Sequence, residues 1–327
     1  MNVLKNFAAG LGRVLKSPAL ILWIYFASVL IALPVSLAVK NILHESFGMS
    51  LVNENMRAGF DLSWFGEFSA GSSGLASTFG PWVTGIVPVL SNLESLLDGK
   101  LLRGGTLLLA GGAFLLLWTF FAGGILDRYA NPGAPRLRVR FFAHCGDNFF
   151  SFLRLLAISL ALYYAVFRFA ANPLHSWVEN STRDVTTERT VIFYTAAVYA
   201  LTALLLAFFT LVFDYARIAI VVEHRRSALF AFLRGLRFVF SNPVRTCGLY
   251  LLLTATGLVL FGTYGYAAPG PGQATWRAVV GAFLLGQAFI LCRIVLKLWF
   301  LSSQTLLFQS AQSAAAPAQA MPGPTVL

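Results

Sequence analysis

Besides Arg154 and Lys297, five charged residues lie within or just after long apolar stretches: Asp127, Arg128, Asp214, Arg217 and Arg293. An ionised group at such a depth in a bilayer is costly, so it is expected to pair with an opposite charge or to face a polar pathway. We therefore expect a charge pair of Asp214 with Arg217 or Arg293, and a repeat-related pair of Asp127 with Arg128. The alternative is structural, because all five lie within about two helical turns of one interface, from which long cationic side chains reach water.

Two sets of three cations share one spacing, eight residues and then three, which places each set on one face of a helix. The sets are Lys5, Arg13 and Lys16, and Arg226, Arg234 and Arg237. A cationic helix face of this kind can contact the phosphate headgroups of anionic lipid. The alternative is ordinary anchoring by basic residues on one side of a membrane.

Residue patterns typical of catalysis or metal binding are sparse. The four histidines are scattered, so no metal site is predicted, and no nucleophile elbow, HExxH motif or phosphate-binding loop occurs. No catalytic residue and no cofactor is therefore predicted. An enzyme acting on lipid could draw only on the acids and histidines near one interface. These are Asp127, His144, Asp147, Asp214, Glu223 and His224.

The amino-acid composition calls for a bilayer. Of the 327 residues, 57% are hydrophobic and only 11% are charged, whereas a soluble domain carries about a quarter charged residues. Several apolar stretches reach the roughly 20 residues that cross the hydrocarbon as a helix, and the shorter alternating segments of a membrane barrel are absent. The predicted class is an all-α polytopic membrane protein. Nucleic-acid binding is not expected, because the net charge of +11 is not gathered in a separate basic module.

Six membrane spans are predicted within a single membrane domain over residues 1–310. They cover about residues 19–39, 105–126, 152–170, 191–212, 246–266 and 278–300. If both termini are cytoplasmic, the inner side carries roughly twice as many Lys and Arg residues as the outer side, in agreement with the positive-inside rule.

Amphipathic segments and loops are expected beside the spans. Residues 1–17 predict a cytoplasmic amphipathic surface helix, and residues 141–150 predict a shorter one before the third span. The aromatic-rich segment 40–103 predicts an outer cap, either passive at the interface or a lid that binds a ligand or partner. A polar outer loop is expected at residues 171–190, and a disordered cytoplasmic tail at residues 311–327.

Residues at a constant offset predict an internal repeat of a surface helix with the spans that flank it. Two segments match at these positions: Phe7, Gly10, Leu11, Val14 and Pro18 against Phe232, Gly235, Leu236, Val239 and Pro243. A degenerate third segment has Cys145 where the other two have glycine. The chain would then consist of a surface helix with the first span, two helix hairpins, and a closing sixth span.

This order of surface helix, Ser-Pro or Asn-Pro break and basic hinge resembles the membrane domains of uncharacterised bacterial multi-pass inner-membrane proteins. These include the membrane domains attached to glycerophosphodiester phosphodiesterases. The resemblance implies a membrane domain without an assigned catalytic role, located in a bacterial inner (plasma) membrane. The soluble phosphodiesterase barrel and its metal-binding carboxylates have no counterpart in the sequence, so no hydrolase activity follows.

Three functions stay open at this point. The first is a non-enzymatic scaffold or assembly protein, or one that interacts with lipid through its surface helices. The second is a transporter or permease subunit, which a repeat favours and the lack of mid-span charges disfavours. The third is a membrane-embedded enzyme acting on lipid. The expected partners are anionic lipid headgroups, and a second copy or another membrane protein packed through small residues such as Ala157, Ala161 and Ala165.

Overall fold

A computed structural model describes residues 3–48, 61–73, 75–80, 105–133, 138–183, 187–268 and 275–315. Helices make up nearly all of these ranges, and no strand occurs in them. Six helices are long and apolar enough to cross a membrane. The predicted fold class, an all-α polytopic membrane protein, is confirmed.

The six long helices include most of the predicted spans and extend beyond them. They are α2 (Pro18–Phe47), α6 (Gly105–Ala130), α7 (Arg138–Val166), α9 (Glu188–Val222), α11 (Pro243–Ala267) and α12 (Trp276–Ala315). Hydropathy marks only the part of a helix that suits hydrocarbon, whereas the backbone hydrogen bonds continue through the polar turns at its ends. For the same reason α12 continues past residue 310, where the tail was expected to begin. Residues 316–327 lie outside the described ranges.

The third span differs most from its expected form. α7 runs without interruption through residues 141–150, so the prediction of a separate surface helix there is wrong. A π-helix, η3 (Phe167–Ala171), then joins α7 to α8 (Asn172–Thr182), where a polar loop was expected. Pro173 favours such a bulge, because it lacks an N–H and its ring crowds the carbonyl four residues earlier. The chain therefore stays helical from Arg138 to Thr182.

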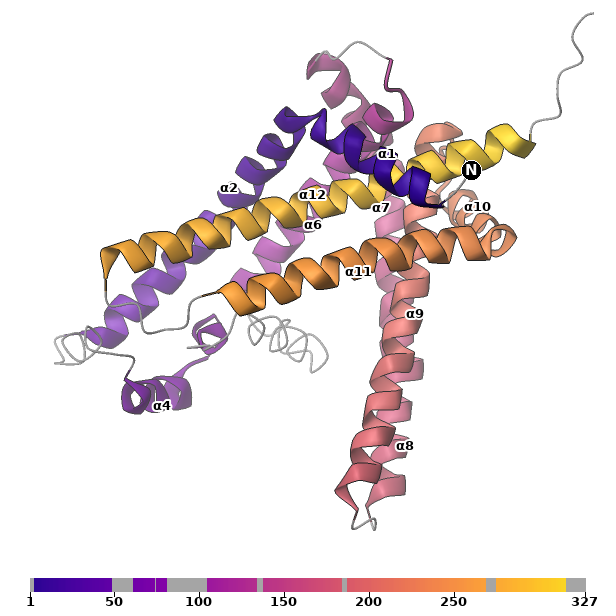
Figure 1. Ribbon diagram of the computed structural model, residues 1–327. Helices are drawn as coiled ribbons and strands as arrows, with labels where there is room; N and C mark the ends of the chain where they lie inside the picture. Colours follow the sequence, from indigo (N-terminus) through magenta and orange to yellow (C-terminus); the bar gives the residue numbers. More distant parts are fainter. Residues whose placement is uncertain are drawn as a thin grey trace, which may run out of the picture. The chain divides into compact units, whose positions relative to one another are not determined.

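Contacts divide the chain into two compact units. The first unit comprises Met1–Arg13, Thr119–Leu251 and Phe300–Leu327. Within it, α7 and α8 run beside α9, and α10 (Ala228–Ser241) packs along α9 (Figure 1). Its core contains three aromatic rings, with the centroid of Phe238 lying 4.8 Å from those of Tyr215 and Phe308. The ends of α9, α10 and α12 are thereby held together.

Two crossings in the first unit depend on a glycine of a short helix. A Cβ added at Gly235 of α10 would lie 2.6 Å from the carbonyl oxygen of Val212 on α9. A Cβ added at Gly10 of α1 (Val3–Leu15) would lie 2.0 Å from Oγ of Ser303 on α12. Glycine is required in both places because the backbone of one helix touches the other helix.

A third crossing has the small residues on the other partner. Here Gly123 and Gly124 belong to the membrane helix α6, and a Cβ on Gly124 would lie 2.7 Å from Sγ of Cys145 on α7. In the first two crossings the glycine lies on the short helix, α10 or α1, whereas here the glycines lie on the long membrane helix α6 and Cys145 lies on α7. The internal repeat stays a prediction.

The second unit comprises Val14–Trp118 and Leu252–Trp299. In it, α4 (Leu62–Gly71) begins at Asp61, whose side chain accepts hydrogen bonds from two backbone N–H groups of the first turn. Trp64 of α4 stacks between Phe47 and Phe68, at centroid distances of 4.7 and 5.1 Å. η1 (Ala76–Thr78) follows. These aromatic contacts lie within the predicted cap, of which residues 49–60, 74 and 81–103 lie outside the described ranges.

Candidate functional site

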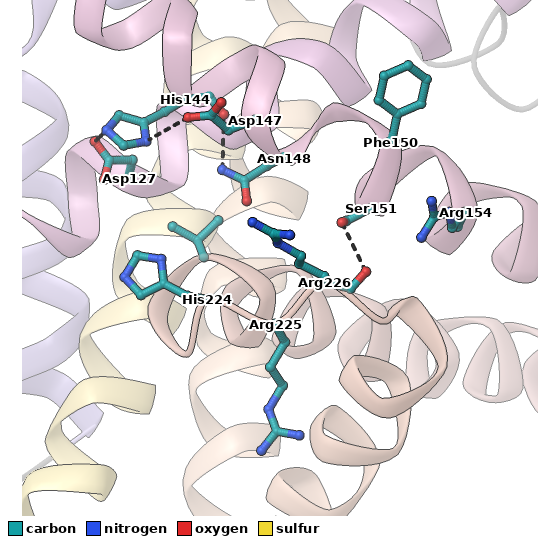
Figure 2. A pocket seen from close by; sticks show the side chains of 11 residues that line it. Asp127, His144, Asp147, Asn148, Phe150, Ser151, Arg154, His224, Arg225 and Arg226 are labelled. Atoms are coloured by element: carbon teal, nitrogen blue, oxygen red, sulfur yellow. Dashed lines mark hydrogen bonds and ion pairs between the residues drawn. The ribbon is translucent and has the colours of Figure 1, made fainter.

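A polar cleft of about 620 Å³ lies in the first unit (Figure 2). It is lined by the end of α6, by α7, and by the hinge that joins α9 to α10. Four of the acids and histidines that could serve chemistry near one interface line this cleft together. They are Asp127, His144, Asp147 and His224.

One face of α7 forms a wall of the cleft. His144, Asp147, Ser151 and Arg154 all line the cleft, and they recur every three or four residues, so they lie above one another on the helix surface. This face could form only because α7 is continuous. A break before residue 152 would have separated His144 from Arg154.

At one end of the cleft, His144 lies between two carboxylates. Its Nε2 is 3.5 Å from Oδ2 of Asp127, and its Nδ1 is 4.0 Å from Oδ2 of Asp147. Asp127 also lies 3.8 Å from Nε of Arg140 and accepts a hydrogen bond of 2.8 Å from Nδ2 of Asn131. The Asp127 side chain is 11% exposed and that of Asp147 is 73% exposed. Asp147 therefore presents the more accessible carboxylate.

Three arginines line the same cleft, Arg154, Arg225 and Arg226, and Arg225 is bonded to Glu223. The guanidinium of Arg226 points into the cleft (Figure 2), while the Arg226 carbonyl accepts a hydrogen bond of 3.2 Å from the Ser151 hydroxyl. Arg154 lies one turn after Ser151 on α7. Among the described residues, no carboxylate forms an ion pair with Arg154 or Arg226. Both guanidinium groups therefore remain able to bind an anion.

The hinge between α9 and α10 is fixed by Glu223. Its carboxylate accepts hydrogen bonds from Nε of Arg225 at 2.5 Å, Nε of Arg234 at 2.9 Å and Nε2 of Gln312 at 2.8 Å. Burial by itself would raise the pKa of Glu223, but the hydrogen bonds and charges of Arg234 and Arg225 outweigh it, so the pKa lies below its usual value. Glu223 thus ties the hinge to α10 and to the end of α12.

His224 determines how the hinge faces the cleft. It has a φ of +51°, a left-handed conformation uncommon for a residue other than glycine. The N–H of Arg225 donates to the carbonyl of Ile220 at 3.1 Å, the bond expected where a helix ends in a left-handed residue. This turn sends Arg225 away from the acids of the cleft, toward Glu223, and leaves Arg226 pointing inward (Figure 2).

The acid of the second hairpin, Asp214, does not line the cleft. Like Asp127, it is 8% exposed as a whole residue. Its Oδ1 accepts a hydrogen bond of 3.2 Å from Nη1 of Arg217, and its Oδ2 accepts one of 3.3 Å from Nε2 of Gln304. Arg293 belongs to the second unit, where its guanidinium carbon is 5.8 Å from the ring centroid of Phe289. A polar pathway through these charges stays a prediction, as does the pairing of Asp127 with Arg128.

In both cationic sets the middle residue is engaged inside the protein. Arg13 donates from Nη1 to the carbonyl of Tyr129 at 2.5 Å, and Arg234 donates to Glu223. Burial lowers the pKa of Arg13 from its usual value. The outer members of the sets are exposed. They are Lys5, Lys16, Arg226 and Arg237. Lipid contact by these residues stays a prediction.

Several uncharged or weakly patterned residues of this region were not singled out from the sequence. Gln304 and Gln312, which bind Asp214 and Glu223, follow the apolar part of α12 and carry no charge. Their spacing of eight residues on one helix face was the available signal. Asn148 and Ser151 could have been found from their spacing to His144, given a continuous α7.

The fold defines this chain as an α-helical integral membrane protein, and comparison with known proteins adds no narrower class. No protein-family model, no curated protein and no solved structure matches the chain. Within the described ranges, no group of three or more His, Cys, Asp or Glu side chains could hold a metal ion. The chemistry of the cleft must therefore be judged from its own charges and hydrogen-bonding groups.

Proposed function

We propose that this membrane protein binds phospholipid headgroups in the cleft, and that it acts as a non-enzymatic scaffold or lipid-organising component. The observation that carries the proposal is the Arg226 guanidinium, which points into a cleft that also contains Arg154. A guanidinium presents its N–H groups in a planar fork that matches two oxygens of a phosphate. Two such groups in one cleft suit the phosphate of a phospholipid.

The surroundings of the cleft favour a lipid over a soluble phosphate. Phe150 lines the cleft and is 67% exposed. Beyond Arg154, α7 continues as an apolar helix on which Leu160 and Tyr164 are exposed. A phosphate held by the arginines would therefore lie at the end of an apolar helix surface, along which acyl chains can extend.

The exposed cations outside the cleft would add weaker attraction. Lys5, Lys16 and Arg237 are exposed, and each basic side chain near an anionic membrane surface contributes about 1 kcal/mol. With the cleft on the cytoplasmic side of a bacterial inner membrane, these residues would face the leaflet in which the positive-inside rule places basic residues. They would support binding without selecting a headgroup.

Native mass spectrometry of the full chain in mild detergent tests this proposal. After delipidation and addition of phosphatidylglycerol, we expect the wild type to retain lipid, and Arg226→Gln with Arg154→Gln to retain at least tenfold less, because charge-assisted hydrogen bonds are lost. Arg189→Gln is the matched control, since Arg189 is exposed, does not line the cleft and belongs to neither cationic set. Equal retention by the wild type and the double variant would show that the cleft is not the lipid site.

A further inference from the structure

We infer that the cleft selects a headgroup carrying a primary amine beyond its phosphate, as in phosphoethanolamine lipids. This inference rests on the proposed phosphate binding by Arg226 and Arg154 and adds the opposite charge of the same cleft. Asp147 and Asp127 line it together with Arg154 and Arg226. A ligand with one anionic and one cationic group can neutralise both kinds of side chain at once.

Asp147 is the residue suited to the amine. Its side chain is 73% exposed, and its ion-pair distance to His144 is 4.0 Å, too long for a hydrogen bond. Asp127 is less suited, because it is 11% exposed and already lies beside His144, Arg140 and Asn131. The acidic end therefore offers one accessible carboxylate to a cation.

Asn148 adds a second acceptor beside Asp147. Its Nδ2 donates to the carbonyl of His144 at 3.0 Å, which leaves Oδ1 as the free end of the amide. Figure 2 shows this oxygen on the side of the cleft where the Arg226 guanidinium lies. A primary ammonium has three N–H donors and can use both a carboxylate and an amide oxygen.

The same groups disfavour the other common headgroups. A choline group has no N–H to donate, and it is recognised by cages of aromatic rings, whereas Phe150 is the aromatic residue of this lining. A glycerol headgroup carries no positive charge to neutralise Asp147. A headgroup with a second phosphate would be repelled by the same carboxylate. The cleft, at about 620 Å³, lies within the usual size of ligand sites.

Competition between lipids of identical acyl chains tests the inference. Delipidated full-length protein is given equal amounts of phosphatidylethanolamine, phosphatidylglycerol and phosphatidylcholine, and the retained lipids are identified by native mass spectrometry. We expect about tenfold preference for phosphatidylethanolamine in the wild type, the size of a single charge-assisted interaction. Asp147→Asn should abolish this preference while phosphatidylglycerol is still retained. Glu179→Gln, which changes an exposed acid outside the cleft, should keep the preference.

The outcomes separate this inference from the proposal beneath it. If retention depends on Arg226 but the wild type holds phosphatidylethanolamine and phosphatidylglycerol equally, the amine preference is overturned and phosphate binding stands. If retention does not depend on Arg226, both fail. Competition with free O-phosphoethanolamine distinguishes a lipid from a soluble ligand that carries the same groups. We expect the free compound to displace the lipid only weakly. If O-phosphoethanolamine displaces the lipid at the same concentration as the lipid, the assignment of a lipid ligand is wrong and the cleft binds a soluble ligand.

Discussion

The α6–α7 and α9–α10 hairpins place an acid and a helix crossing at similar positions but use them differently. In α9–α10, the crossing helix carries Gly235 and ends at Ser241, before Pro243. In α6–α7, the crossed helix carries the glycines, and α7 continues as a membrane-span helix. Proline disfavours the helical conformation of the residue before it, so α10 ends as a short helix along α9. Without a proline, α7 extends its polar face beyond the crossing.

The acids of the two hairpins, Asp214 and Asp127, also have different surroundings. Asp214 is enclosed by Arg217 and by Gln304 of α12, and its charge serves packing in the core. Asp127 lies 3.5 Å from His144 at one end of a cleft that remains open. Both acids are 8% exposed, so the difference lies in their surroundings: Asp127 lines the cleft and Asp214 does not. Function is therefore better sought in the α6–α7 hairpin, although Asp214 is the acid with a direct hydrogen bond from an arginine.

The largest expected effect comes from adding a methyl group at the two crossings. In Gly235→Ala, the Cβ would meet the backbone of Val212 and Ala216 at 2.6 and 2.8 Å, and we expect a loss of about 1–3 kcal/mol in stability. In Gly124→Ala, it would meet the side chains of Cys145 and Phe141, which can move, and the loss should be smaller. Thermal unfolding in detergent measures both.

Gly146→Ala is the control for this pair, because nothing lies within 4 Å of a Cβ built there. Alanine is also the better helix former by about 1 kcal/mol, so this variant should be at least as stable as the wild type. Equal losses at Gly235 and Gly124 would contradict the difference between a backbone contact at Gly235 and a side-chain contact at Gly124.

Neutralising the two acids should give the next largest difference. Asp214→Asn weakens hydrogen bonds to Arg217 and Gln304 in the core, and we expect it to lower stability by about 1–2 kcal/mol. Asp127→Asn should cost less, because its basic partners His144 and Arg140 lie 3.5 and 3.8 Å away, and an asparagine oxygen can still accept the hydrogen bond from Asn131. Denaturation of both variants in one detergent allows direct comparison. Adding Arg217→Gln to Asp214→Asn should cost little more, and full additivity would speak against the pair.

The smallest expected effect is the pH dependence of stability that comes from Glu223. This residue fixes the hinge of the α9–α10 hairpin and has no counterpart described for the α6–α7 hairpin. The pKa of Glu223 is lowered in the folded protein. Its stabilising contribution is therefore complete above its usual value of 4.5 and is lost as the pH falls through the lowered value. We expect a contribution of about 1 kcal/mol or less. Glu223→Gln should unfold with a weaker dependence on pH in this range, and an unchanged dependence would rule out Glu223 as its source.

The spans were predictable because apolar composition over some 20 residues is a local property of the sequence. The continuity of α7 was harder to predict, since the basic and polar residues before residue 152 resemble those at the start of α10. The decisive difference is that Pro243 follows α10 closely, whereas residues 138–166 of α7 contain no proline. This is visible in the sequence, but the helix boundaries are needed to interpret it. Hydropathy alone ends each span too early.

The cleft could not be predicted, because it joins residues far apart in the chain. His144 and His224 both belong to the small group of acids and histidines near one interface, but only packing of the α9–α10 hinge beside α7 brings them together. The bond between Glu223 and Gln312 likewise needs the end of α12 to reach that hinge. Charge and spacing identify candidates within one helix, and they do not determine which helices meet.

The crossing of α1 with α12, at Gly10 and Ser303, has a consequence for biosynthesis. The ribosome adds about 5–20 residues per second, so α1 is complete tens of seconds before its partner exists. During this time the buried Asn6 and the Gly10 face have no helix to cover them. An amphipathic helix can wait in the headgroup layer, with Lys5 and Lys16 toward water. The first unit can therefore be completed only after translation has passed α12, and a nascent chain stalled before Phe300 would lack the surface on which its own beginning must dock.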